Sequence, residues 1–312
     1  MKRTSRQSET ISHLSTEQRN PTSANLDHES TLDIVRIINR EDAKVAGAVL
    51  KALPQIAKAI DIIAAHLRTG GRLLYVGAGT SGRIAALDAS ECPPTFSTDP
   101  RMVQFIIAGG PNALGAAVEA NEDSRELGVS EMAKRKPGKK DVVVGIAASG
   151  RTPFTVAAIE YARKRGAATV AVTCNENSPL EQAADIGIVT PVGPEVLSGS
   201  SRMKAGTAQK MVLNMLTTGA MTRLGYVYGN LMVNVNPKNA KLVERAIQIL
   251  QDAAEVDRSS ADAAFRSSGR NVPAALVMLK TGLPPAQAKQ RLKKHKGNVR
   301  QAIEDTADRI PR

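Results

Sequence analysis

Short runs of Val, Ile and Leu alternate with amphipathic stretches through the middle of the chain. The runs predict strands near 72–76, 103–107, 141–147, 168–173 and 186–189. The spacing of apolar residues predicts helices near 81–90, 111–127, 152–165, 178–183 and 200–224. Continuous apolar strands that alternate with helices are typical of a parallel sheet covered on both faces. We therefore expect an α/β fold, a three-layer αβα sandwich, with ligands at the carboxyl ends of the strands.

The two ends of the chain follow other patterns. Residues 1–30 are polar and aperiodic, so we expect an extended arm there rather than a packed element. Residues 31–39 and 42–68 have helical spacing, with a break or kink at Pro54. After about residue 245 the strand pattern ends and short helices are predicted.

This C-terminal region contains an internal repeat with a spacing of 27 residues. The matched pairs are Ala261 and Ala288, Phe265 and Leu292, Asn271 and Asn298, Val272 and Val299, and Ala275 and Ala302. The repeat predicts two similar copies of a small all-helical module. Their expected role is to stabilise or oligomerise the main domain. We therefore expect an arm with a helix (1–45), an α/β domain (46–245) and a helical module (246–312).

A net charge of +12 raises the question of a nucleic-acid or membrane partner. The excess lies mainly at 2–19 and 289–300, with a smaller group at 134–140, and we interpret each as a solvated face. Aromatic residues make up 3% and Trp is absent, which argues against base stacking. No run approaches 18 apolar residues, the length of a membrane-spanning helix. We expect neither nucleic acid nor membrane as a partner.

The location of the protein is predicted from its cysteines and its N-terminus. Cys92 and Cys174 lie far apart, which indicates a reducing compartment. No apolar segment follows Lys2 and Arg3, so no secretory signal peptide is expected. The prediction is a cytoplasmic protein.

Two strand–turn–helix segments, at 73–83 and 142–152, each combine glycines with hydroxyl residues. The first contains Gly77-x-Gly79-x-x-Gly82, the spacing of a dinucleotide-binding loop, but the next strand ends in glycines rather than in the acidic residue that holds ribose. Neither segment continues into the Gly-Lys-Ser/Thr of a nucleotide-binding P-loop. Glycines and a helix N-terminus suit a phosphate. We expect a phosphorylated small molecule held between the two segments.

Two carboxylates are candidates for acid and base chemistry. Glu91 precedes Pro93 and Pro94, which are expected to end its helix, so the negative helix end would raise its pKa. Glu122 lies in an acidic stretch after the strand at 103–107. Either residue could instead be an ordinary surface carboxylate.

Other residues with reactive or polar side chains have structural roles as alternatives. The serines at 198–201, followed by Lys204, could contact a ligand or cap the long helix. Cys92 fits a buried apolar position better than a nucleophile. The histidines have no metal-ligand spacing; they are His13, His28, His66 and His295.

Five sequence runs together resemble the N-acetylmuramic acid 6-phosphate etherases. They are 77–83, 88–94, 122–125, 147–153 and 199–207, and the likeness begins with Thr16-Glu17-x-Arg19-Asn20. The resemblance covers most of the chain. It implies a sugar isomerase (SIS) domain, a ubiquitin-associated-type (UBA-like) module at the C-terminus, and a homodimer with sites near the interface.

The resemblance also implies an activity and a set of site residues. The reaction is cleavage of the D-lactyl ether of N-acetylmuramic acid 6-phosphate by elimination and water addition, in cell-wall recycling, with no metal or redox cofactor. Glu91 and Glu122 match the acid/base pair, with their individual roles left open. The substrate-binding residues are expected to be Gly79, Thr80, Ser81, Ser149, Gly150, Arg151, Thr152, Ser200, Ser201 and Lys204.

The sequence leaves two alternative functions open. An aldose–ketose sugar-phosphate isomerase would also remove the proton at C2, but it has no ether oxygen to protonate. A non-catalytic sugar-phosphate sensor resembling the glucokinase regulatory protein would carry two SIS domains in one chain, whereas this chain has room for one. The presence of both Glu91 and Glu122 favours the etherase.

Overall fold

The computed structural model describes residues 14–116, 121–235, 237 and 239–305. The chain forms two compact units. The first comprises the described residues within 14–89 and Val103–Leu216, and the second comprises Ser90–Met102 and the described residues within 217–305. The division into three parts at residues 45 and 245 stays a prediction.

A parallel sheet forms the centre of the first unit. Its strands are β1 (Leu73–Gly77), β2 (Val103–Ile107), β3 (Val142–Ile146), β4 (Ala168–Thr173) and β5 (Ile186–Val189). Their order in the sheet is β2-β1-β3-β4-β5, and every neighbouring pair is parallel. The five strands predicted from the apolar runs are confirmed. All side chains of β1 and β3 are buried, as a strand covered on both faces requires.

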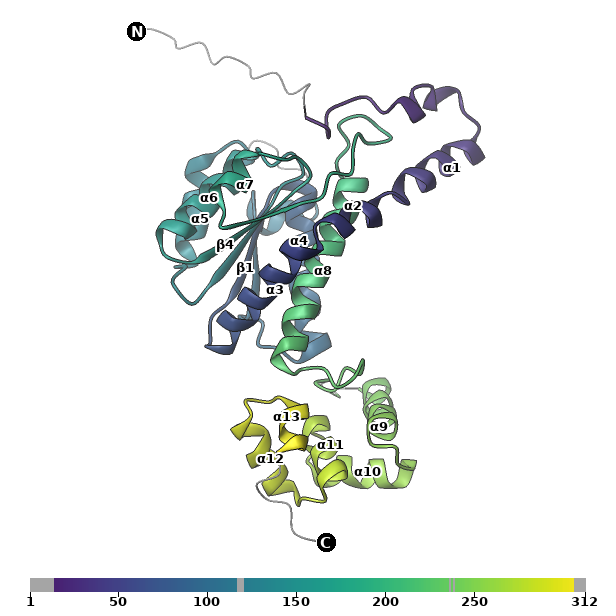
Figure 1. The fold of residues 1–312 in the computed structure, drawn as a ribbon, viewed down its shortest axis with the longest axis vertical. Coiled ribbons are helices and arrows are strands. Elements are labelled where there is room, and N and C mark those ends of the chain that lie inside the picture. Colours follow the sequence, from purple (N-terminus) through teal and green to yellow (C-terminus); the bar gives the residue numbers. More distant parts are fainter. Residues whose placement is uncertain (1–13, 117–120, 236, 238, 306–312) are drawn as a thin grey trace. The chain divides into compact units, whose positions relative to one another are not determined.

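Helices cover both faces of this sheet, which confirms the α/β three-layer fold (Figure 1). On one side lie α5 (Arg125–Lys134), α6 (Pro153–Lys164) and α7 (Pro179–Ala183), and on the other lie α3 (Leu53–Arg68), α4 (Gly79–Phe96) and α8 (Lys204–Leu224). Fully buried Phe154 and Ile159 join α6 to the core.

The N-terminal region departs from the expected extended arm. Residues 1–13 lie outside the described part of the chain, but Leu14, Thr16 and Asn20 are buried. Two short 3₁₀ turns follow at Pro21–Ser23 and Leu26–His28. The arm prediction is therefore wrong from residue 14 onward, because polar side chains there form specific hydrogen bonds that its composition does not reveal.

The next helices agree with the spacing of the apolar residues. They are α1 (Thr31–Asp42), α2 (Val45–Lys51) and α3. Pro54 lies in the first turn of α3, where a missing N–H costs nothing, so it marks the expected break.

Two helix predictions are wrong. Instead of one helix over 111–127, a 3₁₀ helix (η3, Gly110–Leu114) comes first and α5 begins only at Arg125, where Ser124 Oγ accepts a hydrogen bond from the Leu127 N–H. The intervening residues 117–120 lie outside the described part. Pro93 and Pro94 do not end α4, because a proline keeps its carbonyl acceptor and the Ser97 N–H donates to that of Pro93.

The second unit is helical around its own apolar core, as expected for the C-terminal region. Its helices are α9 (Ala240–Ala254), α10 (Arg258–Ser267), α11 (Val272–Thr281), α12 (Pro285–Lys294) and α13 (Val299–Glu304). The repeat is confirmed, since Asn271 and Asn298 each cap the helix that follows by accepting a backbone N–H. Val272 and Val299 behind these caps are both buried.

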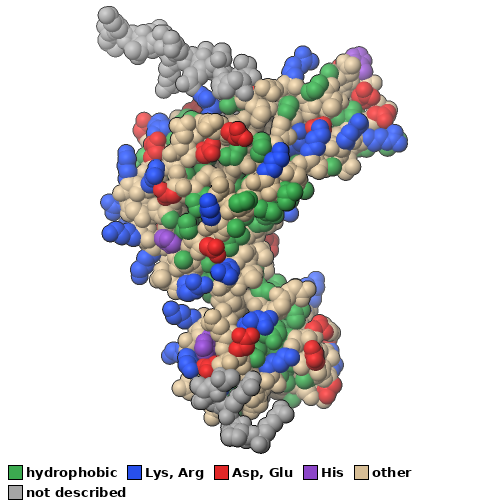
Figure 2. Space-filling view, viewed as in Figure 1, with side chains coloured by type: hydrophobic (Ala, Val, Ile, Leu, Met, Phe, Trp, Pro, Cys, Tyr) green, Lys and Arg blue, Asp and Glu red, His purple; other side chains and the backbone are tan. Residues whose placement is uncertain are grey.

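Lysines and arginines are spread over the visible face among acidic and neutral side chains (Figure 2). Every helix in the described ranges is too short or too polar to span a bilayer.

Candidate active site

A polar cavity of about 580 Å³ lies in the first unit at the carboxyl ends of β1 and β3. These two strands are neighbours in the sheet. In the sequence, β2 comes between them, and it lies on the other side of β1. The strand order therefore reverses at this point, which is where open parallel sheets bind ligands. Seven of the residues expected at the site line the cavity: Gly79, Thr80, Ser81, Glu122, Ser149, Thr152 and Ser201.

Gly79 and Glu122 fit one another closely at the start of α4. The backbone of Gly79 has a φ of +50°, which side-chain-bearing residues rarely adopt. A Cβ at this position would lie 3.0 Å from Glu122 Oε1. Glycine thus lets the carboxylate of Glu122 lie against the first loop, where β1 passes into α4.

Ser81 shares its hydroxyl with a buried glutamine of α8. Ser81 Oγ donates to Gln209 Oε1 at 3.0 Å, and Gln209 Nε2 is buried without a hydrogen-bond partner among the described residues. The first amide N–H groups of α4 have no carbonyl partner within the helix. The first loop therefore offers backbone donors and the hydroxyls of Thr80 and Ser81.

The second loop contributes Ser149 and Thr152 at the start of α6. Gly150 and Arg151 do not line the cavity. Gly150 has a φ of +69°, and a Cβ there would lie 2.3 Å from Ser178 Oγ, so its role is to fit the loop against α7. The Arg151 N–H donates to Ser149 Oγ at 3.2 Å and so orients that serine.

Glu122 lies on the segment that separates η3 from α5. Its carbonyl oxygen accepts a hydrogen bond from the Phe154 N–H at 3.0 Å, which ties the segment to the first turn of α6. Arg83 contacts the preceding loop, donating to the carbonyls of Leu114 and Ala116. The wrongly predicted helix is thus replaced by a loop that brings Glu122 and Asp123 to the cavity.

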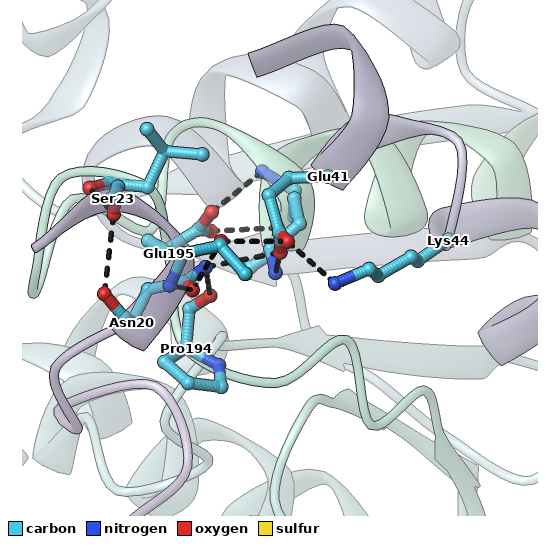
Figure 3. A network of polar contacts seen from close by, with 10 residues as sticks. Asn20, Ser23, Glu41, Lys44, Pro194 and Glu195 are labelled. Carbon is cyan, nitrogen blue, oxygen red and sulfur yellow. Dashed lines mark hydrogen bonds and ion pairs between the residues drawn. The ribbon is translucent and has the colours of Figure 1, made fainter. Parts of the chain in front are cut away.

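Lys204 does not belong to this site, contrary to the sequence-based expectation. It is 1% exposed, and its Nζ lies 2.7 Å from Glu41 Oε2. Glu41 also accepts hydrogen bonds from Asn20 and Lys44 (Figure 3). Burial alone would raise the pKa of the Glu41 carboxyl, but hydrogen bonds from Lys204, Lys44, Asn20 and Thr22 outweigh it and lower the pKa to about 2. Lys204 is a structural cation.

The serines before α8 also differ from the prediction. The helix begins at Lys204, and buried Glu195 caps it by accepting the N–H groups of Lys204 and Ala205. Burial raises the pKa of Glu195, against the lowering effect of these hydrogen bonds. Ser201 lines the cavity and Ser200 does not.

Glu91 is exposed and does not line the cavity. It belongs to the second unit, whereas Glu122 belongs to the first. It stands in the second half of α4. The helix continues past it, so the expected position at a helix end is wrong.

Glu17 lines the same cavity, although it was not among the expected site residues. It stands in the motif Thr16-Glu17-x-Arg19-Asn20, where the family likeness begins. This motif is the sequence feature from which Glu17 could have been predicted as a site residue. Within the described residues, no group of three or more His, Cys, Asp or Glu side chains could hold a metal ion.

Comparison with known proteins identifies the family. A model of the glucokinase regulatory protein N-terminal SIS domain matches residues 55–163, and a SIS domain model matches 131–219. N-acetylmuramic acid 6-phosphate etherase of Klebsiella aerogenes is 50% identical over 95% of this chain and 99% of its own. The enzyme of the same name from Photorhabdus laumondii is 52% identical over 94% and 97%. The chain belongs to the N-acetylmuramic acid 6-phosphate etherase family.

The match to these etherases spans both compact units, because neither unit alone accounts for 95% of the chain. A solved phosphoheptose isomerase from Francisella tularensis is 21% identical, with a TM-score of 0.49, and the match covers 62% of this chain and 100% of that chain.

Proposed function

We propose that this protein cleaves the D-lactyl ether of N-acetylmuramic acid 6-phosphate with water, giving N-acetylglucosamine 6-phosphate and D-lactate in cell-wall recycling. The observation that carries the proposal is the cavity at β1 and β3, where two helix N-termini converge beside Glu122. The etherases at about 50% identity over nearly the whole chain support it.

The phosphate is held by the N-termini of α4 and α6. Their free amide groups and positive dipole ends favour an anion, and Thr80, Ser149 and Thr152 add hydroxyl donors. Rotation of the Gln209 amide by 180° lets its Nε2 donate to Ser81 Oγ, which frees the Ser81 proton for a phosphate oxygen. Gln209 thus positions Ser81.

Glu122 acts as the base. In the open-chain sugar the C2 proton lies beside the aldehyde and is acidic enough for a carboxylate to remove. The electron pair left at C2 forms a C2–C3 double bond while the C3–O bond breaks, and the departing lactate oxygen takes a proton. Water then adds to C3 and a proton returns to C2. The sequence of steps involves no net oxidation, so it requires no redox cofactor.

Glu91 is the proposed donor of the proton to the ether oxygen. It is exposed and does not line the cavity of its own chain. We therefore assign Glu91 to the site of a second copy in a homodimer. Leu87, one turn earlier on the same helix face, is 54% exposed, as an interface residue would be in an isolated chain.

Mixed subunits test this assignment. Glu91→Gln and Glu122→Gln proteins, each inactive alone, are unfolded together and refolded at equal concentrations. If Glu91 acts across the interface, random pairing yields hybrid dimers with one intact site, which restores about a quarter of the wild-type activity. If both residues act within one chain, every site in the mixture stays defective, and the assignment to the partner is wrong.

We further propose that the protein is located in the cytoplasm. Cys92 and Cys174 are both buried and unbridged, and burial raises the pKa of the Cys174 thiol to about 12. Thiols that do not form disulfides suit a reducing compartment.

Release of D-lactate from N-acetylmuramic acid 6-phosphate by the purified protein tests the function. The expected result is stoichiometric D-lactate and N-acetylglucosamine 6-phosphate. Aldose–ketose conversion of a sugar phosphate without lactate release would indicate the isomerase alternative. Binding of the sugar phosphate without turnover would indicate the sensor.

A further inference from the structure

Residues 14–23, here called the N-terminal strap, are hydrogen-bonded to loops that surround the cavity. At one end, Ser15 N and Oγ both donate to Asn175 Oδ1, at 3.0 and 2.9 Å. Asn175 Nδ2 donates in turn to Thr16 Oγ1 at 3.2 Å and to the carbonyl of Ala148, in the loop between β3 and α6, at 3.3 Å. One side chain therefore joins the strap to that loop.

The other end of the strap is hydrogen-bonded next to Glu41, a member of the buried ion pair (Figure 3). Asn20 Nδ2 donates to Glu41 Oε2 and to the Pro194 carbonyl, each at 3.0 Å. Ser23 Oγ donates to the Val196 carbonyl at 2.7 Å. The segment after Pro194 leads to Gly199 and Ser201, which line the cavity. Both ends of the strap thus hold loops of the candidate site.

Glu17 lies between these two attachments and lines the cavity. Thr16 Oγ1 donates to Glu17 Oε1 at 3.2 Å. Because Asn175 donates to the Thr16 oxygen, the hydroxyl proton is directed to Glu17. The chain Asn175–Thr16–Glu17 orients one carboxylate oxygen. Oε2 lies near Gly199, where a Cβ would be 3.6 Å away.

We propose that Glu17 is a substrate-binding residue that accepts hydrogen bonds from hydroxyl or amide N–H groups of the sugar. The proposal rests on the sugar-phosphate function argued above. A carboxylate repels a phosphate, so Glu17 does not serve the anion end of the ligand. It suits the donor groups of a sugar, and hydrogen bonds to a charged acceptor are the stronger kind. Because hydrogen bonds hold the strap at both ends, Glu17 is positioned by the folded first unit.

Calorimetric binding to the full-length protein separates the sugar end from the phosphate end of the site. The two probes are N-acetylglucosamine 6-phosphate and inorganic phosphate. Glu17→Gln keeps the size of the side chain and removes its charge, and we expect it to weaken sugar-phosphate binding about tenfold or more. Binding of inorganic phosphate should be unchanged or slightly tighter. Glu29→Gln, an exposed glutamate beyond the strap, is the matched control.

A second variant tests the orienting role of Thr16. Thr16→Val keeps the shape of the buried side chain and removes the hydroxyl. It should weaken sugar-phosphate binding less than Glu17→Gln, again without weakening inorganic phosphate. In turnover, Glu17→Gln should raise KM more than it lowers kcat, because the residue binds the sugar and moves no proton.

Unchanged affinity of Glu17→Gln for the sugar phosphate would overturn the proposal, as would an equal loss for both probes, which would indicate a general distortion of the cavity. A wild-type protein that bound neither probe would overturn the sugar-phosphate function itself. Normal product binding with kcat lowered alone would assign Glu17 to proton transfer instead.

Discussion

Lys204 Nζ lies 2.7 Å from Glu41 Oε2, and both side chains are almost completely excluded from solvent. This ion pair joins the end of α1 to the start of α8. The cost of burying two charges is offset because Glu41 also accepts hydrogen bonds from Asn20, Thr22 and Lys44. Lys204, which follows the serines at 198–201 in the sequence, therefore has a structural role.

Glu41→Gln should lower the free energy of unfolding by about 3–5 kcal/mol at pH 7, because it leaves the Lys204 cation buried without its partner. Urea denaturation of the purified protein measures this loss. Glu41→Leu combined with Lys204→Met removes both charges and should recover most of it. A double variant as unstable as Glu41→Gln would contradict this account.

The same pair gives a pH dependence. The folded pKa of Glu41, about 2, lies below its ordinary value of 4.5, so the stabilisation is fully present above 4.5 and is lost as the pH falls toward 2. The free energy of unfolding of the wild type should fall over this window by roughly 3 kcal/mol more than that of Glu41→Gln. Parallel pH profiles for the two proteins would show that the carboxyl titrates normally when folded.

Glu122→Gln should lower the rate of lactate release about 10²–10⁴-fold without affecting the fold, because it removes a base while keeping its size. Glu126→Gln, four residues on and exposed, is the control and should keep near-normal turnover. Steady-state kinetics and circular dichroism check both. A nearly active Glu122→Gln would make this residue an ordinary loop carboxylate.

Gln209→Leu should raise KM about 2- to 10-fold, the effect of one neutral hydrogen bond, because Ser81 loses the partner that directs its proton. Gln182→Leu, on an exposed face of α7, is the control. Titration with inorganic phosphate should show the same loss. If Gln209→Leu bound phosphate as the wild type does, Gln209 would only fill space in the core.

Asn298→Ala should destabilise the helical unit by about 1 kcal/mol, since its side chain caps α13 by accepting the Gln301 N–H at 3.0 Å. Asn271→Ala should cost a similar amount because it caps α11 in the same way. Thermal unfolding measures both. Effects that differ several-fold would argue against structural equivalence of the two repeats.

The sheet, its helices and most of the lining of the candidate site follow from local sequence patterns. Apolar runs determine which residues form β1 and β3, and strand order brings the loops after them together. The position of Lys204 could not be predicted in this way, because its partner Glu41 lies 163 residues away in the sequence. Glu122 was identified by its motif, yet the loop that carries it depends on a hydrogen bond to Phe154, which no periodicity reveals.

The origin of the hydrogen at C2 tests the central claim most directly. Turnover of N-acetylmuramic acid 6-phosphate in heavy water, analysed by mass spectrometry and NMR, should give N-acetylglucosamine 6-phosphate with deuterium at C2. In ¹⁸O-labelled water the new oxygen should appear at C3. Elimination followed by water addition requires both labels. Product that keeps its original C2 hydrogen would contradict elimination and leave Glu122 without its role as base.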